Sequence, residues 1–279
     1  MACGKFTFAK ATGNFTIAGD VGCNARGTRQ KTRARTKTRN QKRRTILKMQ
    51  SIIGLIPLII TVLMIPQFAR FGHSGNQILG NSYLSFQLKY QIILLGSVLL
   101  SLGIIFLISR SQFLSFFRIG NISAPATAVN WLGIKSGEKW ASIGINMLII
   151  ITLVTATFLF FQFKNMPISW NLLFVNIHWI LLFSLLNAFS EEMIFRFGIV
   201  SSLQSIAPVS VIILISAISF GIVHYGGTPG GFVGIGLAGI MGFILCKSII
   251  ETQGIFWAIL IHFIQDVLII SSIVISNKS

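Results

Sequence analysis

The chain repeats apolar stretches of about 20 residues, each long enough to cross the ~30 Å hydrocarbon core of a bilayer as an α-helix. Backbone N–H and C=O groups find no water there, so a spanning segment must satisfy them by internal hydrogen bonds. Only 10% of the residues are charged, against roughly 25% in a soluble domain. The sequence therefore predicts an all-α fold, a polytopic transmembrane helical bundle of about seven spans. The predicted spans are residues 51–69, 89–109, 140–163, about 172–202, 209–225, 232–250 and 255–275.

The fourth stretch is too long for one straight crossing. At ~1.5 Å per residue, a helix over residues 170–204 would reach roughly 50 Å, well beyond a ~30 Å core. We expect it to be strongly tilted, broken, or preceded by an interfacial piece around Trp170 and Trp179. The choice sets the membrane depth of every residue on that helix.

Residues 1–50 form a basic arm. Of the 23 Lys and Arg residues of the chain, 13 precede Met49, with Asp20 as the single acid. Between Arg26 and Arg44 basic residues alternate with Thr and no apolar period occurs, which predicts a disordered, solvated arm. No aromatic interleaving or folded reader accompanies the charge, so we expect no nucleic-acid partner. An organellar presequence and a start of translation upstream of the native one are open alternatives.

Loop charges predict the orientation of the bundle. The positive-inside rule places residues 1–50 in the cytoplasm, and the longest internal loop, 110–139, then falls on the same side with four basic residues. Loops 70–88 and 164–169 fall outside and carry fewer basic residues. The N-terminus is therefore predicted to be cytoplasmic.

Acidic residues are rare after the arm, and two of them are adjacent within an apolar helix. An ionised residue at the centre of a span costs about 2.5–3.5 kcal/mol on insertion scales, so Glu191 and Glu192 are expected to have a function. The alternative, a helix that ends near residue 190, is disfavoured because apolar residues continue beyond it. Glu192 and Arg196 are four residues apart and are expected to form an ion pair. Glu191 points about 100° away without a partner on its own helix, which makes it the candidate general base.

Two histidines complete a candidate site on three separate spans. His224 lies near the end of the fifth span, and His262 lies one turn before Asp266 on the seventh. His73 and His178 have no acidic neighbour at helical spacing and are expected to be packing residues. The joint occurrence of Glu191 with the other three groups is hard to explain by packing alone. A stripe of small residues in the sixth span, Gly234, Ala238 and Gly242, predicts close approach of another helix.

These residues fall into three ordered motifs: EExxxR from Glu191 to Arg196, FxxxH from Phe220 to His224, and HxxxD from His262 to Asp266. The set resembles the CPBP family of intramembrane proteases, which includes the type II CAAX prenyl endopeptidases and the bacterial Abi, or bacteriocin-immunity, proteins. The segment from Glu251 to Ala258 is similar to the segment that precedes the last motif in that family. The resemblance covers roughly residues 170–270. Residues 51–169 are expected to be additional N-terminal transmembrane helices, and 170–275 the catalytic core.

The resemblance implies a role for each residue. Glu191 would activate water with the help of His224, while His262 and Asp266 would stabilise the oxyanion formed at the scissile carbonyl. Glu192 and Arg196 would support them. The family usually has Asn at the position of Asp266, and a carboxylate cannot donate a hydrogen bond unless it is protonated. Asp266 is therefore expected to orient His262 instead.

Metal dependence is a separate question, because two His and one Glu form the ligand set of several zinc peptidases. In that reading the ligands would be Glu191, His224 and His262. The sequence has no HExxH motif, and the resemblance favours glutamate catalysis without a cofactor, with zinc as the alternative.

We therefore expect an intramembrane endopeptidase that hydrolyses peptide bonds of a membrane-associated or lipidated protein or peptide, with the lipid bilayer as its surroundings. Short loops and compact length favour a bacterial cell membrane. The alternatives are a non-catalytic bacteriocin-immunity protein and a proton-coupled membrane carrier, since intramembrane acids also suit proton relays. Carriers commonly contain internal repeats, and the two halves of this chain show no convincing match.

Overall fold

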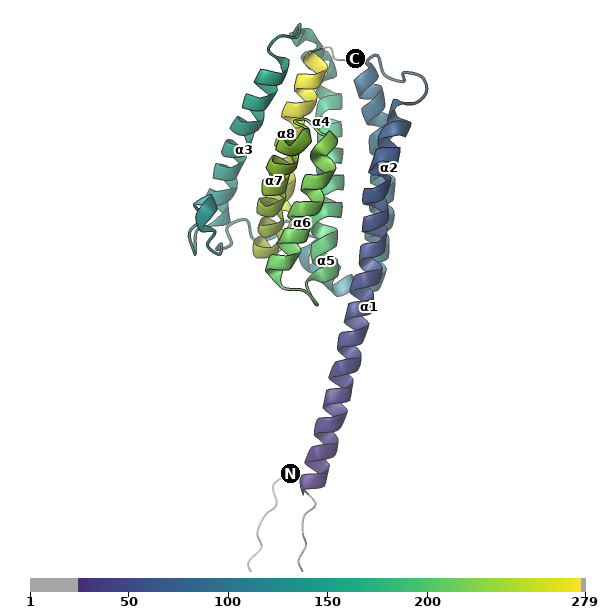
Figure 1. The fold of residues 1–279 in the computed structure, drawn as a ribbon, viewed down its shortest axis with the longest axis vertical. Helices are drawn as coiled ribbons and strands as arrows, with labels where there is room; N and C mark the ends of the chain where they lie inside the picture. Colours follow the sequence, from purple (N-terminus) through teal and green to yellow (C-terminus); the bar gives the residue numbers. More distant parts are fainter. Residues whose placement is uncertain (1–24, 277–279) are drawn as a thin grey trace, which may run out of the picture. The chain divides into compact units, whose positions relative to one another are not determined.

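The computed structural model describes residues 25–276. In that range the secondary-structure elements are helices, and there is no β-strand (Figure 1). The α-helices are α1 (Ala25–His73), α2 (Ser82–Phe116), α3 (Trp140–Phe163), α4 (Trp170–Glu192), α5 (Ile199–Leu203), α6 (Val209–Val223), α7 (Gly231–Thr252) and α8 (Phe256–Ile275). Three short segments of other helical type are η1 (Asn130–Leu132), η2 (Met193–Gly198) and η3 (His224–Gly226). Of these, η2 is a π-helix and the other two are 3-10 turns.

Seven of the described helical segments are long and apolar enough to cross a membrane. They coincide with the predicted spans to within a few residues, except that the first begins at Thr45 and the second extends from Ser82 to Phe116. Large apolar side chains such as Leu107 and Phe232 are more than 80% exposed, which is favourable where the surrounding solvent is lipid. The all-α, polytopic bundle is therefore confirmed.

The basic arm differs from its prediction. From Ala25 onward it is helical and continuous with the first span in α1, whereas its charge pattern predicts disorder; residues 1–24 lie outside the described residues. The physical reason is that Arg, Lys, Gln and Ala are good helix formers. A helix already nucleated in the apolar span also extends by one hydrogen bond per residue without a new nucleation cost. The chain divides into two units between Arg44 and Thr45.

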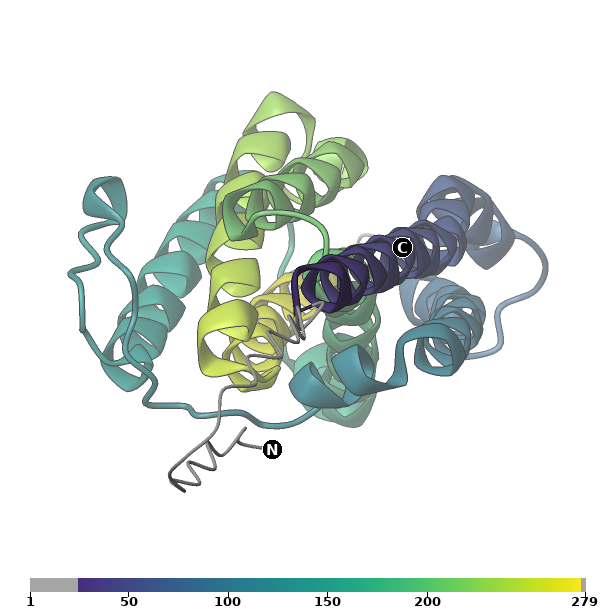
Figure 2. The ribbon, with the colours of Figure 1, turned by 90° about the horizontal axis from the view of Figure 1, so that it is seen from below.

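Within the unit from Thr45 onward, α4 and α8 form the middle of the bundle. Helix α8 packs against α4 on one side and α3 on another, α4 also packs against α2, and α6 pairs with α7 (Figure 2). The small-residue stripe on α7 acts as predicted, because a Cβ at Gly242 would lie only 3.1 Å from the Cα of Ala217 on α6. Polar groups where α4, α6, α7 and α8 meet are thus shielded from lipid.

The long fourth span is interrupted, which is one of the three alternatives that its length left open. Helix α4 passes into the π-helical segment η2, and α5 then continues the same span. A wider π turn leaves backbone groups without their usual partners, and π-bulges are frequent at functional sites. The hydroxyl of Ser216 on α6 donates to the carbonyl of Phe195 at 2.6 Å and satisfies one of them. The interruption also sets the direction of Arg196, which lies within η2.

Candidate active site

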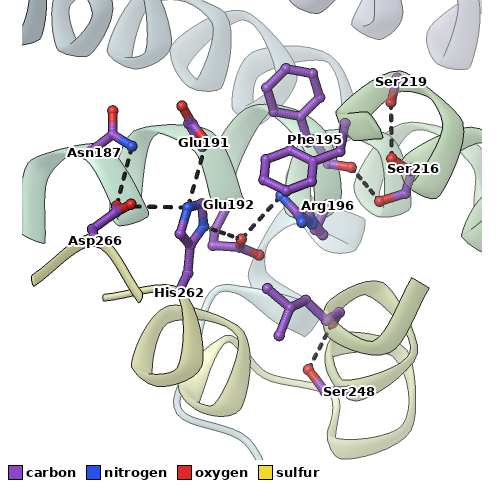
Figure 3. Close-up of polar contacts among 12 residues, drawn as sticks. Asn187, Glu191, Glu192, Phe195, Arg196, Ser216, Ser219, Ser248, His262 and Asp266 are labelled. Carbon is purple, nitrogen blue, oxygen red and sulfur yellow. Dashed lines mark hydrogen bonds and ion pairs between the residues drawn. The ribbon is translucent and has the colours of Figure 1, made fainter. Parts of the chain in front are cut away.

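Five of the six motif residues that sequence analysis singled out meet at one place between α4, η2 and α8 (Figure 3). Glu191 and Glu192 are the last two residues of α4, and Arg196 follows in η2. His262 and Asp266 come from α8, which packs along α4. The close packing of these two helices is what brings the acids of one to the histidine of the other.

His262 is the centre of the cluster, with a side chain that is only 3% exposed. Its Nδ1 lies 2.7 Å from Glu192 Oε1. Its Nε2 lies 3.5 Å from Glu191 Oε2 and 3.6 Å from Asp266 Oδ2. A carboxylate only accepts hydrogen bonds, so Nδ1 donates to Glu192 and leaves Nε2 to the other two acids. One imidazole therefore links three carboxyl groups.

Glu192 and Arg196 form the ion pair that their spacing predicts, at 3.1 Å, with both side chains fully buried. Charge rather than an aligned hydrogen bond holds them together, because the guanidinium nitrogens meet no acceptor at hydrogen-bonding geometry among residues 25–276. The guanidinium carbon also lies 3.6 Å from the ring centroid of Phe220, a cation–π contact. Sequence reasoning missed the second role of Glu192, which binds His262 through the same oxygen.

His224 lies apart from this cluster. Its Nδ1 is 2.9 Å from the carbonyl oxygen of Phe220, and it makes no described hydrogen bond to Glu191. Phe220 contacts both histidines, with ring centroids 4.2 Å from His224 and 5.6 Å from His262. The first residue of the FxxxH motif is therefore the aromatic side chain that packs between the two histidines and Arg196.

A cavity of about 400 Å³ connects the two histidines. Apolar side chains of α3 and α7 supply most of its lining, and its polar lining residues are Thr155, His224, Thr228, His262, Gln265 and Asp266. Glu191 is not among the lining residues, although its side chain is 13% exposed. The cavity is large enough for a short segment of chain beside the cluster.

The zinc alternative depends on whether its predicted ligands come together. Within residues 25–276 no group of three or more His, Cys, Asp or Glu residues is placed to hold a metal ion. The alternative ligand set of Glu191, His224 and His262 is therefore not brought together in this arrangement. We derive no chemical step through a metal.

Asn187 belongs to the site and was not predicted from the sequence. Its Nδ2 donates to Asp266 Oδ2 at 3.2 Å, and its Oδ1 accepts from Gln91 Nε2 on α2 at 2.9 Å. The sequence does contain a hint of this role, because Asn187 is a polar residue in an apolar span, four residues before Glu191. Gln91 lies about 100 residues away and could not have been linked to the site by spacing.

A second polar cluster ties the loop after α2 to the end of α7. Glu251 pairs with Lys247 one turn earlier, and also accepts from the indole of Trp140 at 2.8 Å and from the backbone N–H of Thr127 at 3.0 Å. The Glu251 lead-in to the last motif is thus a structural clamp, remote from His262 in its contacts.

Residues 173–268 match the family described as Type II CAAX prenyl endopeptidase Rce1-like. The matched region runs from the first turn of α4 into α8 and contains all six motif residues, so the CPBP resemblance is confirmed for this part of the chain. The apolar helices and this match together indicate an integral, multi-pass membrane protein whose residues 173–268 are similar to that family. Comparison with curated proteins and with solved structures finds no match.

Proposed function

We propose that this chain is an intramembrane endopeptidase that cleaves a membrane-associated or lipidated protein or peptide with water activated by Glu191. The observation that carries the proposal is the placement of Glu191 and Asp266 at one nitrogen of His262, whose other nitrogen is fixed by Glu192. This is a set of groups for moving protons, held inside a bundle of membrane helices.

Glu191 is the group best suited to take a proton from water. Glu192 is neutralised by Arg196, whereas Glu191 has no cation of its own and its Oε2 has no hydrogen-bond partner at the site. A carboxylate of this kind can accept the proton of a water molecule as the oxygen attacks the scissile carbonyl. The same proton then passes to the leaving amine, so Glu191 is returned to its starting state.

The two histidines have different parts in this proposal. With Nδ1 donating to Glu192, His262 can hold a proton at Nε2 beside Glu191 and Asp266, near the oxyanion that forms on the carbonyl. His224 donates from Nδ1 to the Phe220 carbonyl, which leaves its Nε2 to bind water or the peptide in the cavity. His224 thus assists through the cavity and not by a direct bond to Glu191.

The cavity supports a substrate that arrives through the membrane. Its walls from α3 and α7 are mainly apolar, so a lipid-linked or hydrophobic segment can enter without losing a hydration shell. We further propose that hydrolysis needs no metal. Cleavage that persists in excess chelator is the expected result, and restoration of lost activity by zinc would overturn this part.

The test is a comparison of membrane peptides in cells that carry the wild type, Glu191→Gln or Glu138→Gln. Glu138 is a half-buried loop carboxylate that accepts from the backbone N–H of Lys135, and it provides a control of identical chemistry away from the site. We expect a processed membrane peptide to disappear with Glu191→Gln and to persist with Glu138→Gln. Equal processing in all three would overturn the proposal. If the peptide were never cleaved but a protective phenotype survived Glu191→Gln, a non-catalytic binding protein would be indicated.

A further inference from the structure

We propose that Asn187 is a positioning residue of the catalytic site, which fixes Asp266 so that Asp266 in turn holds His262; this inference rests on the proposed function. The first observation is the hydrogen bond from Asn187 Nδ2 to Asp266 Oδ2, at 3.2 Å. The same carboxylate oxygen is the one that faces His262 Nε2, at 3.6 Å. Figure 3 shows Asn187 and His262 on either side of Asp266.

The orientation of the Asn187 amide is set from a third helix. Gln91 Nε2 on α2 donates to Asn187 Oδ1 at 2.9 Å, so the other end of the amide, Nδ2, faces Asp266. A flipped Asn187 would turn its oxygen toward the carboxylate of Asp266 and its N–H groups toward the donor of Gln91, and would lose both bonds. Gln91 therefore makes Asn187 a donor to Asp266 and nothing else.

The arrangement continues along one face of α2. Gln91 Nε2 also donates to Gln87 Oε1 at 3.3 Å, and Gln87 Nε2 donates to the hydroxyl of Tyr83 at 2.7 Å. Gln87 and Gln91 are both buried, with exposed fractions of 8% and 1%. A buried amide is costly unless its hydrogen bonds are made, and apolar residues would fill an ordinary span at no such cost. The two buried glutamines, one turn apart, are explained if their amides help to orient Asn187 toward Asp266.

This role also accounts for an acid where the family usually has Asn. Asp266 offers His262 an acceptor but supplies no amide N–H to the site. Asn187, from the facing helix, brings an amide N–H to the same oxygen, so the site retains one amide and one carboxyl group. The carboxylate of Asp266 is thereby held to one direction and cannot rotate away from His262.

The test compares Asn187→Leu with Asn176→Leu in purified protein reconstituted into vesicles, with a prenylated CAAX peptide as the probe. Asn176 lies on the same helix, is also half-buried, and donates within α4 to the Leu172 carbonyl, so it controls for removing an amide from α4. We expect Asn187→Leu to lower kcat about 10- to 100-fold with little change in KM, because misplacement of a catalytic group by ~1 Å has effects of this size. Asn176→Leu should leave kcat unchanged.

An exchange variant separates positioning from packing. Asn187→Asp alone places two carboxyl groups together and should abolish cleavage, while Asn187→Asp with Asp266→Asn restores one amide and one carboxyl and should recover activity at least about 10-fold. If Asn187→Leu does not fold, Gln91→Leu, which frees the Asn187 amide and also removes the donor to Gln87, should still lower kcat severalfold. Full activity of Asn187→Leu, or no recovery in the exchange variant, would overturn the inference. Cleavage that survives Glu191→Gln would instead overturn the proposed function.

Discussion

Among the residues that the structure describes, two polar clusters share one plan, a glutamate paired with a cation one helical turn away. In the clamp, both oxygens of Glu251 are used: Oε1 binds Lys247 and Thr127, and Oε2 accepts from Trp140. At the site around His262, Oε2 of both Glu191 and Glu192 lacks a hydrogen-bond partner among the described residues. Both carboxylate oxygens of the clamp are engaged, whereas each glutamate at the site has one oxygen without a hydrogen-bond partner in the described part of the chain.

The difference shows that a glutamate paired with a cation four residues away can have different roles in different surroundings. A carboxylate whose lone pairs are all engaged is held in place and has nothing left to accept a proton, so it contributes to stability. A buried carboxylate with an unused oxygen costs free energy, and such groups persist where chemistry needs them. The comparison supports a structural role for Glu251 and agrees with the chemical role proposed for Glu191.

The largest effect on stability is expected from breaking the site's own ion pair. Arg196→Leu leaves Glu192 buried and without its cation, and should lower the free energy of unfolding by about 3–5 kcal/mol. The measurement is thermal unfolding in detergent, compared with the double variant Glu192→Gln/Arg196→Leu. The double variant should recover much of the loss, because no uncompensated charge is left. If it unfolds as readily as Arg196→Leu, the pair is not what stabilises this helix end.

A smaller effect is expected at the clamp. Glu251→Gln keeps the shape of the side chain but removes its charge from Lys247, and should lower the free energy of unfolding by about 1–3 kcal/mol. Cleavage per folded molecule should stay near that of the wild type, as measured by turnover normalised to folded protein. A selective loss of turnover without a loss of stability would show that the two clusters are not separate in function.

Sequence reasoning reached those parts of the site that lie within one helix. The Glu192–Arg196 pair and the approach of His262 to Asp266 follow from a spacing of four residues, and the structure has both. The bond between Glu192 and His262 depends on the register of α4 against α8, which no local pattern records. The contribution of Asn187 depends on the same register and on a further helix.

The fold was predictable because lipid allows so few alternatives. Apolar length alone predicts the spans, and the interruption of the fourth is one of three alternatives that its excess length left open, although the π-helical turn at Met193–Gly198 was not predicted. The prediction of disorder in the basic arm was wrong from Ala25 onward, because the neighbouring apolar span nucleates a helix that extends into the arm. The prediction from local composition failed in the arm because its helix depends on the adjoining span.

The central claim is that Glu191, and not merely a buried glutamate, performs the chemistry. The direct test is single-turnover cleavage of a prenylated CAAX peptide in vesicles by Glu191→Gln and by Glu251→Gln, at equal amounts of folded protein. We predict that Glu191→Gln lowers the rate by at least about 1000-fold, equivalent to ~4 kcal/mol of transition-state stabilisation, while Glu251→Gln stays within about threefold of the wild type. A Glu191→Gln protein that cleaves as fast as Glu251→Gln would contradict the account.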